Sequence, residues 1–284
     1  MSTITTEQQQ YLTYILTDGD SQVAVVPERG GIVTQWKIKD NDVFYLDTER
    51  FKDPSLSVRG GIPLLFPICG NLVDDTYTLA GTTTYQLKQH GFGRTLPWEV
   101  TQQSTEDGAS ITISLKSNEE TRAVYPFDFQ LDYIYTLKGN TLEQRFRHTN
   151  LSDNPMPFST GTHPYFAVAD KANLVFELPS TEYKIKGGTE VFAFNGQFDF
   201  DQDEIDFAFI NLNGQTATVK DGDSTLTISY DENYSTLVFW TVKGKDFYCL
   251  EPWSGPRNAI NTGAFLLTAA PRETVETVIA MTVS

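Results

Sequence analysis

Four short segments of the sequence combine histidine, glutamate and arginine with glycine and aromatic residues, and they are the strongest candidates for chemistry. They cover residues 58–71, 89–94, 159–166 and 250–256. Histidine and glutamate are well suited to moving protons near neutral pH, because burial and neighbouring charges tune their pKa values into that range. These residue types therefore indicate general acid–base catalysis on a polar substrate.

The first two segments place arginines beside glycines. Arg59 precedes Gly60 and Gly61, whose freedom to adopt positive φ or to allow a close backbone approach could put the arginine at a ligand. His90 and Arg94 flank two glycines with aromatic neighbours, an arrangement that suits a polar ligand held on a ring face. Each segment also fits a structural role, the first as a tight turn and the second as a histidine satisfied within the fold.

The other two segments supply a candidate acid and a candidate base. His163 precedes Pro164, which keeps it extended, and small hydroxyl residues surround it. Glu251 directly follows the apolar run 247–250 and so ends a buried strand. Burial there raises the pKa of the carboxylate toward the range that is useful to a general base. The alternative for Glu251 is a structural carboxylate that accepts backbone N–H groups.

Sequence signals for metal, nucleotide or serine-hydrolase chemistry are missing. The three histidines show no HxH, HxxxH or HExxH spacing, and neither Cys69 nor Cys249 belongs to a CxxC pair. The nucleotide-binding pattern GxGxxG and the P-loop pattern are absent, as is the GxSxG of α/β-hydrolases. We therefore expect no metal site and no cofactor. His148 follows an alternating pattern, so it is expected to face solvent or a neighbouring side chain.

Composition restricts the partners of the chain. With 21 basic and 37 acidic residues among 284, the formal charge is −16, which repels phosphate backbones and anionic membranes. Nucleic acid and membrane partners are therefore not expected, although local arginines can still hold a small anion. The sequence opens without a basic and then apolar leader, and no apolar stretch approaches about 18 residues. These features predict a cytoplasmic protein.

The elements that must position these residues are strands. Apolar and polar residues alternate along four runs, as is typical of half-buried antiparallel strands. These runs are residues 111–116, 131–138, 226–230 and 275–283. Turn signals separate the runs, and helical periodicity is nearly absent apart from a short candidate at 48–56. The sequence predicts an all-β fold, a single large antiparallel β-sandwich formed by one domain over residues 1–284.

Taken together and in this order, motifs in these segments resemble those of the aldose 1-epimerase (galactose mutarotase-like) family, including its hexose-6-phosphate mutarotase-like branch. The matching motifs are RGGIPLLFP at 59–67, HGFGR at 90–94, YPFDF at 125–129, GTHPYF at 161–166, DFAF at 206–209, EPW at 251–253 and PRNAINTG at 256–263. They cover most of the chain, and HGFGR, THPYF and EPW are specific as a series. The resemblance implies a galactose mutarotase-like supersandwich that binds a free sugar in a groove on one sheet, with no cofactor, as a monomer or dimer.

The resemblance also implies roles for individual residues. His163 resembles the general acid that protonates the ring oxygen, and Glu251 resembles the base that takes the proton of the anomeric hydroxyl. His90 would bind near the ring oxygen or the C6 hydroxyl, Asp206 would accept hydrogen bonds from sugar hydroxyls, and Arg59 would lie close to the substrate. One acid and one base suffice for mutarotation, so no metal, nucleotide or covalent nucleophile is needed.

Other details of the resemblance concern the sugar-binding surface. Many relatives have a histidine next to the hydroxyl-binding aspartate, where this chain has Phe207, and the acidic run around it also permits a match at Asp203. Aromatic rings would offer their apolar faces to the C–H side of the sugar. These rings are Phe92, Tyr165 and Trp253.

The substrate is open between two chemical classes. In the hexose-6-phosphate branch, arginines near the RGGIP and HGFxR motifs hold the phosphate. This chain has Arg59 and Arg94 in those places, and Arg257 follows just after EPWSGP. The stretch EPWSGPRNAIN is more similar to the branch that is assigned only as aldose 1-epimerases. The main hypothesis is therefore a neutral aldose, with glucose 6-phosphate as the alternative.

Two other classes of protein compete with an epimerase. A non-catalytic carbohydrate-binding protein would have no reason to retain both His163 and Glu251. A glycoside hydrolase needs two carboxylates about 5–10 Å apart across the sugar. Glu251 and Asp206 could take that role, but the histidines would then be unexplained. The joint presence of the candidate acid and base favours an isomerase of hexose metabolism.

Overall fold

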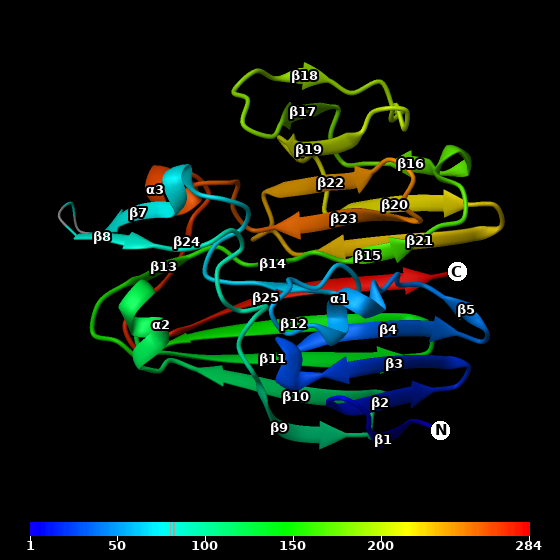
Figure 1. The fold of residues 1–284 in the computed structure, drawn as a ribbon, viewed down its shortest axis with the longest axis horizontal. Coiled ribbons are helices and arrows are strands. Elements are labelled where there is room, and N and C mark those ends of the chain that lie inside the picture. Colours follow the sequence, from blue (N-terminus) through cyan, green and yellow to red (C-terminus); the bar gives the residue numbers. More distant parts are fainter. Residues whose placement is uncertain (80, 82) are drawn as a thin grey trace.

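Two eight-stranded sheets and one five-stranded sheet form the body of the computed structural model, which describes residues 1–79, 81 and 83–284 (Figure 1). The five-stranded sheet contains, in spatial order, β1 (Thr3–Gln8), β2 (Leu12–Asp18), β3 (Ser21–Val26), β4 (Ile32–Ile38) and β5 (Asn41–Asp42). The first eight-stranded sheet contains β16 (Val175–Glu177), β20 (Thr216–Asp221), β21 (Ser224–Tyr230), β25 (Thr274–Val283), β12 (Thr141–Asn150), β11 (Phe129–Lys138), β10 (Ala109–Lys116) and β9 (Glu99–Ser104).

The second eight-stranded sheet carries the candidate acid and base. It contains β18 (Phe192–Ala193), β17 (Glu182–Ile185), β19 (Glu204–Ile210), β22 (Thr236–Val242), β23 (Phe247–Trp253), β14 (Gly161–Thr162) and β6 (Leu64–Leu65), and β15 (Tyr165–Ala167) also pairs with β23. Two short pairs complete the strands, β13 (Met156–Phe158) with β24 (Leu267–Ala269) and β7 (Thr76–Leu79) with β8 (Thr83–Gln86).

The core lies between the β12 sheet on one side and the other two sheets on the other. β2 and β3 pack against β10 and β11, and Figure 1 shows these layers one over the other. One cluster of buried side chains joins all three sheets, with Trp36 from β4, Tyr133 from β11 and Phe239 from β22. The prediction of an all-β sandwich is confirmed.

Alternation along single strands explains how this core forms. In β11 every second residue from Phe129 to Leu137 is buried while its neighbours are partly exposed, as the sequence predicts. The same alternation buries His148 on β12, where its Nε2 atom lies 3.0 Å from the Tyr133 hydroxyl and 3.1 Å from the Thr160 hydroxyl. His148 therefore faces neighbouring side chains, and the solvent-facing alternative is wrong. Burial lowers its pKa to about 3.

The described helices are short. They are the α-helices α1 (Thr48–Lys52), α2 (Glu119–Val124) and α3 (Ala259–Thr262), with 3-10 turns at Pro27–Arg29, Val73–Asp75 and Lys171–Asn173. The predicted helix at 48–56 starts as expected but ends at Lys52, shortly before Pro54. The helix α2 was not predicted, because its six residues are too few to show helical periodicity. Among the described residues, no helix is long and apolar enough to cross a membrane.

Candidate active site

The candidate site lies on the face of β23 that points away from the main core. Strand alternation directs Cys249 and Glu251 to this face, whereas Tyr248 and Leu250 point into the core. The neighbouring strand β22 lies beside β23 in Figure 1 and continues the surface, with Val238 opposite Glu251. An apolar strand covered on both faces therefore delivers a single carboxylate to a buried position.

Glu251 is almost fully buried, with 1% of its surface exposed. The indole Nε1 of Trp253 donates a hydrogen bond of 3.1 Å to its Oε2 atom. Its Oε1 atom accepts no hydrogen bond from any described residue and lies 3.3 Å from Nε2 of His163. Burial raises the pKa of Glu251 well above its ordinary value, and the charge of Asp206 adds to this rise. The charges of Arg257 and Arg94 and the Trp253 hydrogen bond oppose it.

His163 enters the site from the turn between β14 and β15. Its backbone N–H donates to the Pro63 carbonyl at 3.0 Å, and its ring stacks on Tyr165 with centroids 4.8 Å apart. The ring of Trp240 lies roughly perpendicular to the imidazole, with centroids 5.6 Å apart. Burial lowers the pKa of His163 to about 3, and the nearby charge of Arg94 contributes to this shift. The backbone and the two rings therefore hold the imidazole against Glu251.

Together, His163 and Glu251 form a buried pair whose two favoured forms differ only in the position of one proton. Burial disfavours both the imidazolium and the carboxylate, so it favours the neutral pair. The Trp253 hydrogen bond stabilises the carboxylate and acts in the opposite direction, whereas the charges of Arg94 and Arg257 stabilise the carboxylate but destabilise the imidazolium. These groups titrate as a unit because they are in contact. Such a pair can take one proton and give another at the same time.

His90 lies beside this pair, and an unusual backbone places it there. Both His90 and Gly91 adopt positive φ, of 67° and 66°. A side chain at Gly91 would overlap the Phe66 carbonyl oxygen, so glycine is required at this position. The ring of His90 is edge-on to His163 at 5.6 Å. The motif HGFGR therefore fixes the direction in which His90 points.

The hydrogen bonds of His90 define its tautomer. The Gly70 backbone N–H donates to Nδ1 at 3.1 Å, so Nδ1 is unprotonated and the neutral ring carries its proton on Nε2. Nε2 lies 3.1 Å from the side-chain amide nitrogen of Gln89, so the Gln89 amide group has to turn over before its oxygen can accept from a protonated Nε2. Burial lowers the pKa of His90 well below its ordinary value, so the ring stays neutral. His90 is therefore arranged as a neutral hydrogen-bond donor.

Asp206 and Arg257 form an ion pair that the sequence did not indicate. The Arg257 Nη2 atom donates to Asp206 Oδ1 at 2.6 Å, and Lys186 Nζ lies 3.6 Å from Oδ2. Asp206 is buried and its charge acts on Glu251, whereas Asp203 is exposed. The structure thus brings Asp206, and not Asp203, to the site. From its place in the sequence Arg257 is a candidate phosphate ligand, but its guanidinium pairs with the carboxylate of Asp206.

Trp253 occupies a different place from the one expected. It is 1% exposed, and the guanidinium of Arg257 lies over its ring at 5.0 Å. A ring that is buried and covered has no free face for a sugar, so this expectation needs correction. Phe92 also packs away from the site, with its ring 5.8 Å from that of Phe66 in the core. The rings beside His163 are Tyr165, which was expected, and Trp240, which was missed.

Arg59 and Arg94 are the two other arginines that the sequence suggests as phosphate ligands. Among the ion pairs of the described residues, neither Arg59 nor Arg94 takes part. Arg94 donates from Nη2 to the Gln89 carbonyl at 2.9 Å, and its buried Nε has no partner within the described chain. Arg59 is exposed. The charges of both arginines contribute to the low pKa of His163, which places them at the site.

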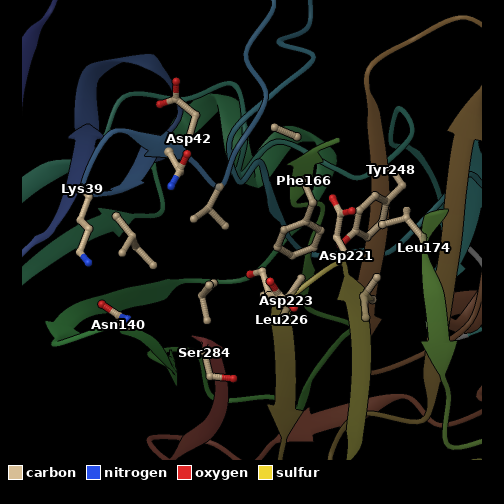
Figure 2. Close-up of a pocket in the computed structure, with 17 residues that line it drawn as sticks. Lys39, Asp42, Asn140, Phe166, Leu174, Asp221, Asp223, Leu226, Tyr248 and Ser284 are labelled. Carbon is tan, nitrogen blue, oxygen red and sulfur yellow. The ribbon is translucent and has the colours of Figure 1, made fainter. Parts of the chain in front are cut away.

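A cleft on the opposite side of the same strands is a separate feature. It has a volume of about 660 Å³, and Phe166 and Tyr248 point into it (Figure 2). These two residues alternate with Tyr165 and Cys249, so they lie on the other face of β15 and β23. Neither His163 nor Glu251 lines this cleft. The cleft therefore does not belong to the candidate active site.

Comparison with known proteins agrees with this geometry. The family model described as aldose 1-epimerase matches residues 13–281. The chain is 25% identical over 288 residues to the chromosomal LacX protein of Lactococcus lactis subsp. lactis, covering 91% of this chain and 90% of that protein. It is 26% identical over 225 residues to the "putative glucose-6-phosphate 1-epimerase" of Cenchrus ciliaris, covering 74% of this chain and 64% of that protein. The solved Slr1438 protein of Synechocystis sp. PCC 6803 is 43% identical, with a TM-score of 0.94 over 100% of this chain and 99% of that one.

Proposed function

The chain belongs to the aldose 1-epimerase family, and from this premise we propose that His163 and Glu251 interconvert the α and β anomers of a hexose by opening and closing its ring. The chain is an isomerase that acts on a small sugar. The observation that supports the assignment to this pair is the 3.3 Å separation between Nε2 of His163 and Oε1 of Glu251 in a buried site. The family match from residue 13 to residue 281 also supports our proposal that the chain is one domain.

The side-by-side arrangement suits the geometry of a hemiacetal. The ring oxygen and the anomeric hydroxyl are bonded to the same carbon, so an acid and a base that serve both must be adjacent. Glu251 takes the hydroxyl proton as the O–H electron pair forms the aldehyde C=O bond. The bond from C1 to the ring oxygen breaks, and that oxygen receives the proton of His163. Rotation about C1–C2 and the reverse transfers then close the ring on the other face.

The electrostatics of the pair suit a reversible reaction. Ring opening converts an imidazolium and a carboxylate into a neutral imidazole and a carboxylic acid, and the total charge of the site does not change. Burial favours the second form, whereas the hydrogen bond from the Trp253 indole favours the carboxylate of the first. Opposing effects bring the two forms closer in free energy, so neither direction faces a large protonation cost. The same transfer therefore works forwards and backwards.

Neighbouring residues have supporting roles in this proposal. His90 would donate from Nε2 to the ring oxygen or the C6 hydroxyl, since that nitrogen carries its proton. Asp206 would accept from sugar hydroxyls, with Arg257 holding the carboxylate in place. Trp253 positions Glu251 through its indole N–H. Trp240, which is partly exposed, would offer ring surface to the C–H side of the sugar, whereas the ring of Tyr165 is buried and stacked on His163.

Polarimetry on freshly dissolved α-D-glucose and α-D-galactose tests the function. Catalytic amounts of the protein should speed the approach to the equilibrium rotation, because each proton transfer by a positioned group contributes typically 10²–10⁴-fold. A carbohydrate-binding protein would leave the rate unchanged. A glycoside hydrolase would instead release the aglycone from an aryl glycoside. Unchanged rotation kinetics across a panel of hexoses and hexose phosphates would refute the proposal.

We propose a neutral aldose as the substrate, and glucose 6-phosphate is the second candidate. Pairing of Arg257 with Asp206 removes one arginine from phosphate binding and supports the first. The absence of ion pairs at Arg59 and Arg94 within the described residues favours the second, as does the printed name of the Cenchrus ciliaris relative. Arg–phosphate contacts are charge-assisted and strong when they are desolvated. The two candidates differ in one measurable ratio.

That ratio is kcat/KM for glucose 6-phosphate divided by kcat/KM for glucose. With a neutral substrate it should be near or below one, and Arg59→Ala and Arg94→Ala should leave it unchanged. One charge-assisted hydrogen bond contributes about 1.5–3 kcal/mol, so a phosphate site would raise the ratio at least about tenfold. Arg272→Ala is the control, because Arg272 pairs with Asp153 at the surface. A high ratio that collapses in Arg94→Ala and falls with added salt would establish the phosphate reading instead.

A further inference from the structure

Cys249 is a fully buried thiol next to the acid–base pair, and the proposed reaction does not use it. It lies two residues before Glu251 on β23 and points to the same face. The Cys249 sulfur, a ring nitrogen of His163 and a carboxylate oxygen of Glu251 all lie within 4.8 Å of one another. We propose that these three side chains form a binding site for Zn²⁺ or a similar thiophilic divalent cation, and that its occupation switches the epimerase off. The switching half of this inference rests on the proposed function, and the binding half does not.

The separations fit tetrahedral coordination. Zn–N and Zn–O bonds are about 2.0–2.1 Å, so two such ligands on a tetrahedral ion are about 3.3–3.4 Å apart. Nε2 of His163 and Oε1 of Glu251 are 3.3 Å apart. A Zn–S bond of about 2.3 Å places sulfur about 3.6 Å from either partner, so separations of up to 4.8 Å have to shorten by no more than about 1.2 Å. These three side chains leave the fourth position of a tetrahedral ion for water or another ligand.

The unsatisfied oxygen of Glu251 points independently to a ligand. Oε1 is buried and accepts no hydrogen bond from any described residue. A buried polar atom without a partner is costly, and such atoms commonly belong to groups that bind something. A sugar hydroxyl would satisfy this atom during catalysis. A metal ion would satisfy it as well, together with the lone pair of Nε2.

The charge balance allows a dication beside several arginines. In the free site, the imidazole–carboxylate pair holds one proton and the thiol holds another, with a total charge of zero. Zn²⁺ replaces both protons, which pass to the buffer, and it leaves a thiolate, a carboxylate and a neutral imidazole. The total charge is again zero, so Arg94 and Arg257 face no additional positive charge. Cysteine, histidine and glutamate are also a donor set that zinc accepts.

Occupation must stop the epimerase because the metal uses the atoms that carry the protons. Zinc bound to Nε2 leaves His163 without a proton to donate, and zinc bound to Oε1 leaves Glu251 without the free lone pair. A chelator that removes the ion should restore full activity. The same logic predicts that prolonged dialysis against EDTA never lowers the rate of the purified enzyme.

The test measures binding and inhibition separately. Chelator-treated protein is titrated with Co²⁺, and a thiolate-to-cobalt absorption band should appear with one ion per chain. Zn²⁺ should then displace the cobalt and inhibit anomer interconversion with the same stoichiometry. Failure of the band would overturn the site whether or not the protein is an epimerase. Activation by zinc, or activity lost in EDTA and restored by zinc, would overturn the inhibitory role.

Two matched variants assign the thiol. Cys249→Ala should keep basal turnover within a few-fold and raise the zinc concentration for half-inhibition at least about tenfold, since even lost outer-shell partners cost 10–100-fold in metal affinity. Cys69→Ala is the control, because Cys69 is also a buried free cysteine but lies outside the ligand group. It should retain both the band and the inhibition. Equal zinc sensitivity of Cys249→Ala and the unaltered protein would contradict the proposal. If Cys249→Ala fails to fold, the band in Cys69→Ala still decides, because Cys249 is then the remaining thiol.

Discussion

Glu251→Gln is expected to lower kcat for anomer interconversion by about 10²- to 10⁴-fold, with the fold unchanged, as loss of a general base typically does. Glutamine has nearly the same shape, and its carbonyl oxygen can still accept the Trp253 indole proton that Oε2 now accepts at 3.1 Å. It removes a buried ionisable group and leaves no uncompensated charge, because burial keeps His163 neutral, so the free energy of unfolding should change little. What it cannot do is exchange a proton with the anomeric hydroxyl.

The measurement is polarimetry at saturating sugar, with circular dichroism and urea unfolding as checks on the fold. Asp203→Asn is the matched control, because this exposed carboxylate lies in the same acidic run as Asp206. It should keep kcat, and it also tests the alternative assignment of the hydroxyl-binding acid. A bell-shaped pH profile in the unaltered enzyme should become distorted in Glu251→Gln, because one member of the titrating pair is gone. Near-normal turnover in a folded Glu251→Gln protein would remove Glu251 from the mechanism.

The parts of the site that sequence could predict are those that local pattern determines. The apolar run that ends at Glu251 predicts a strand covered on both faces, and all seven residues of β23 are buried. His163 and Glu251 meet because β14 and β15 both pair with β23. His148 could also have been placed correctly, because it is in phase with the buried Leu142 and Phe146 on β12.

The parts that sequence could not supply depend on register between distant strands. Asp206 on β19 and Arg257 just after β23 are 51 residues apart, and they meet only when β19, β22 and β23 are aligned side by side. Trp240 lies on β22 opposite Cys249 of β23, and this position brings its ring to His163. The residues around Trp240 in the sequence do not indicate that contact. The proposed role of Cys249 as a metal ligand likewise depends on the pairing of strands that are distant in sequence. Metal-ligand motifs are recognised by the spacing of ligands along one segment of sequence. The group of His163, Cys249 and Glu251 instead comes together from two segments that are distant in sequence.

His163→Gln is expected to reduce kcat by a similar factor of about 10²–10⁴, because the general acid is lost. The glutamine amide can still present an N–H group near the position of Nε2, which keeps a hydrogen bond to the ring oxygen but cannot transfer its proton. Sugar affinity should therefore change little while kcat falls. The experiment compares KM and kcat by polarimetry and checks the fold by urea unfolding. A folded variant that loses affinity but keeps kcat would reassign His163 to binding.

The double variant Glu251→Gln with His163→Gln tests whether the two side chains act as one unit. Independent groups would multiply their losses, to about 10⁴-fold or more. In the proposed mechanism the two proton transfers are simultaneous, so removing either group already ends the concerted path and the second removal should add little. Strong non-additivity of this kind is typical of catalytic residues that act together. Because Nε2 and Oε1 are only 3.3 Å apart, the coupling should be large. Fully multiplicative losses in kcat would show that the acid and the base act in separate steps. They would contradict a mechanism with two simultaneous proton transfers.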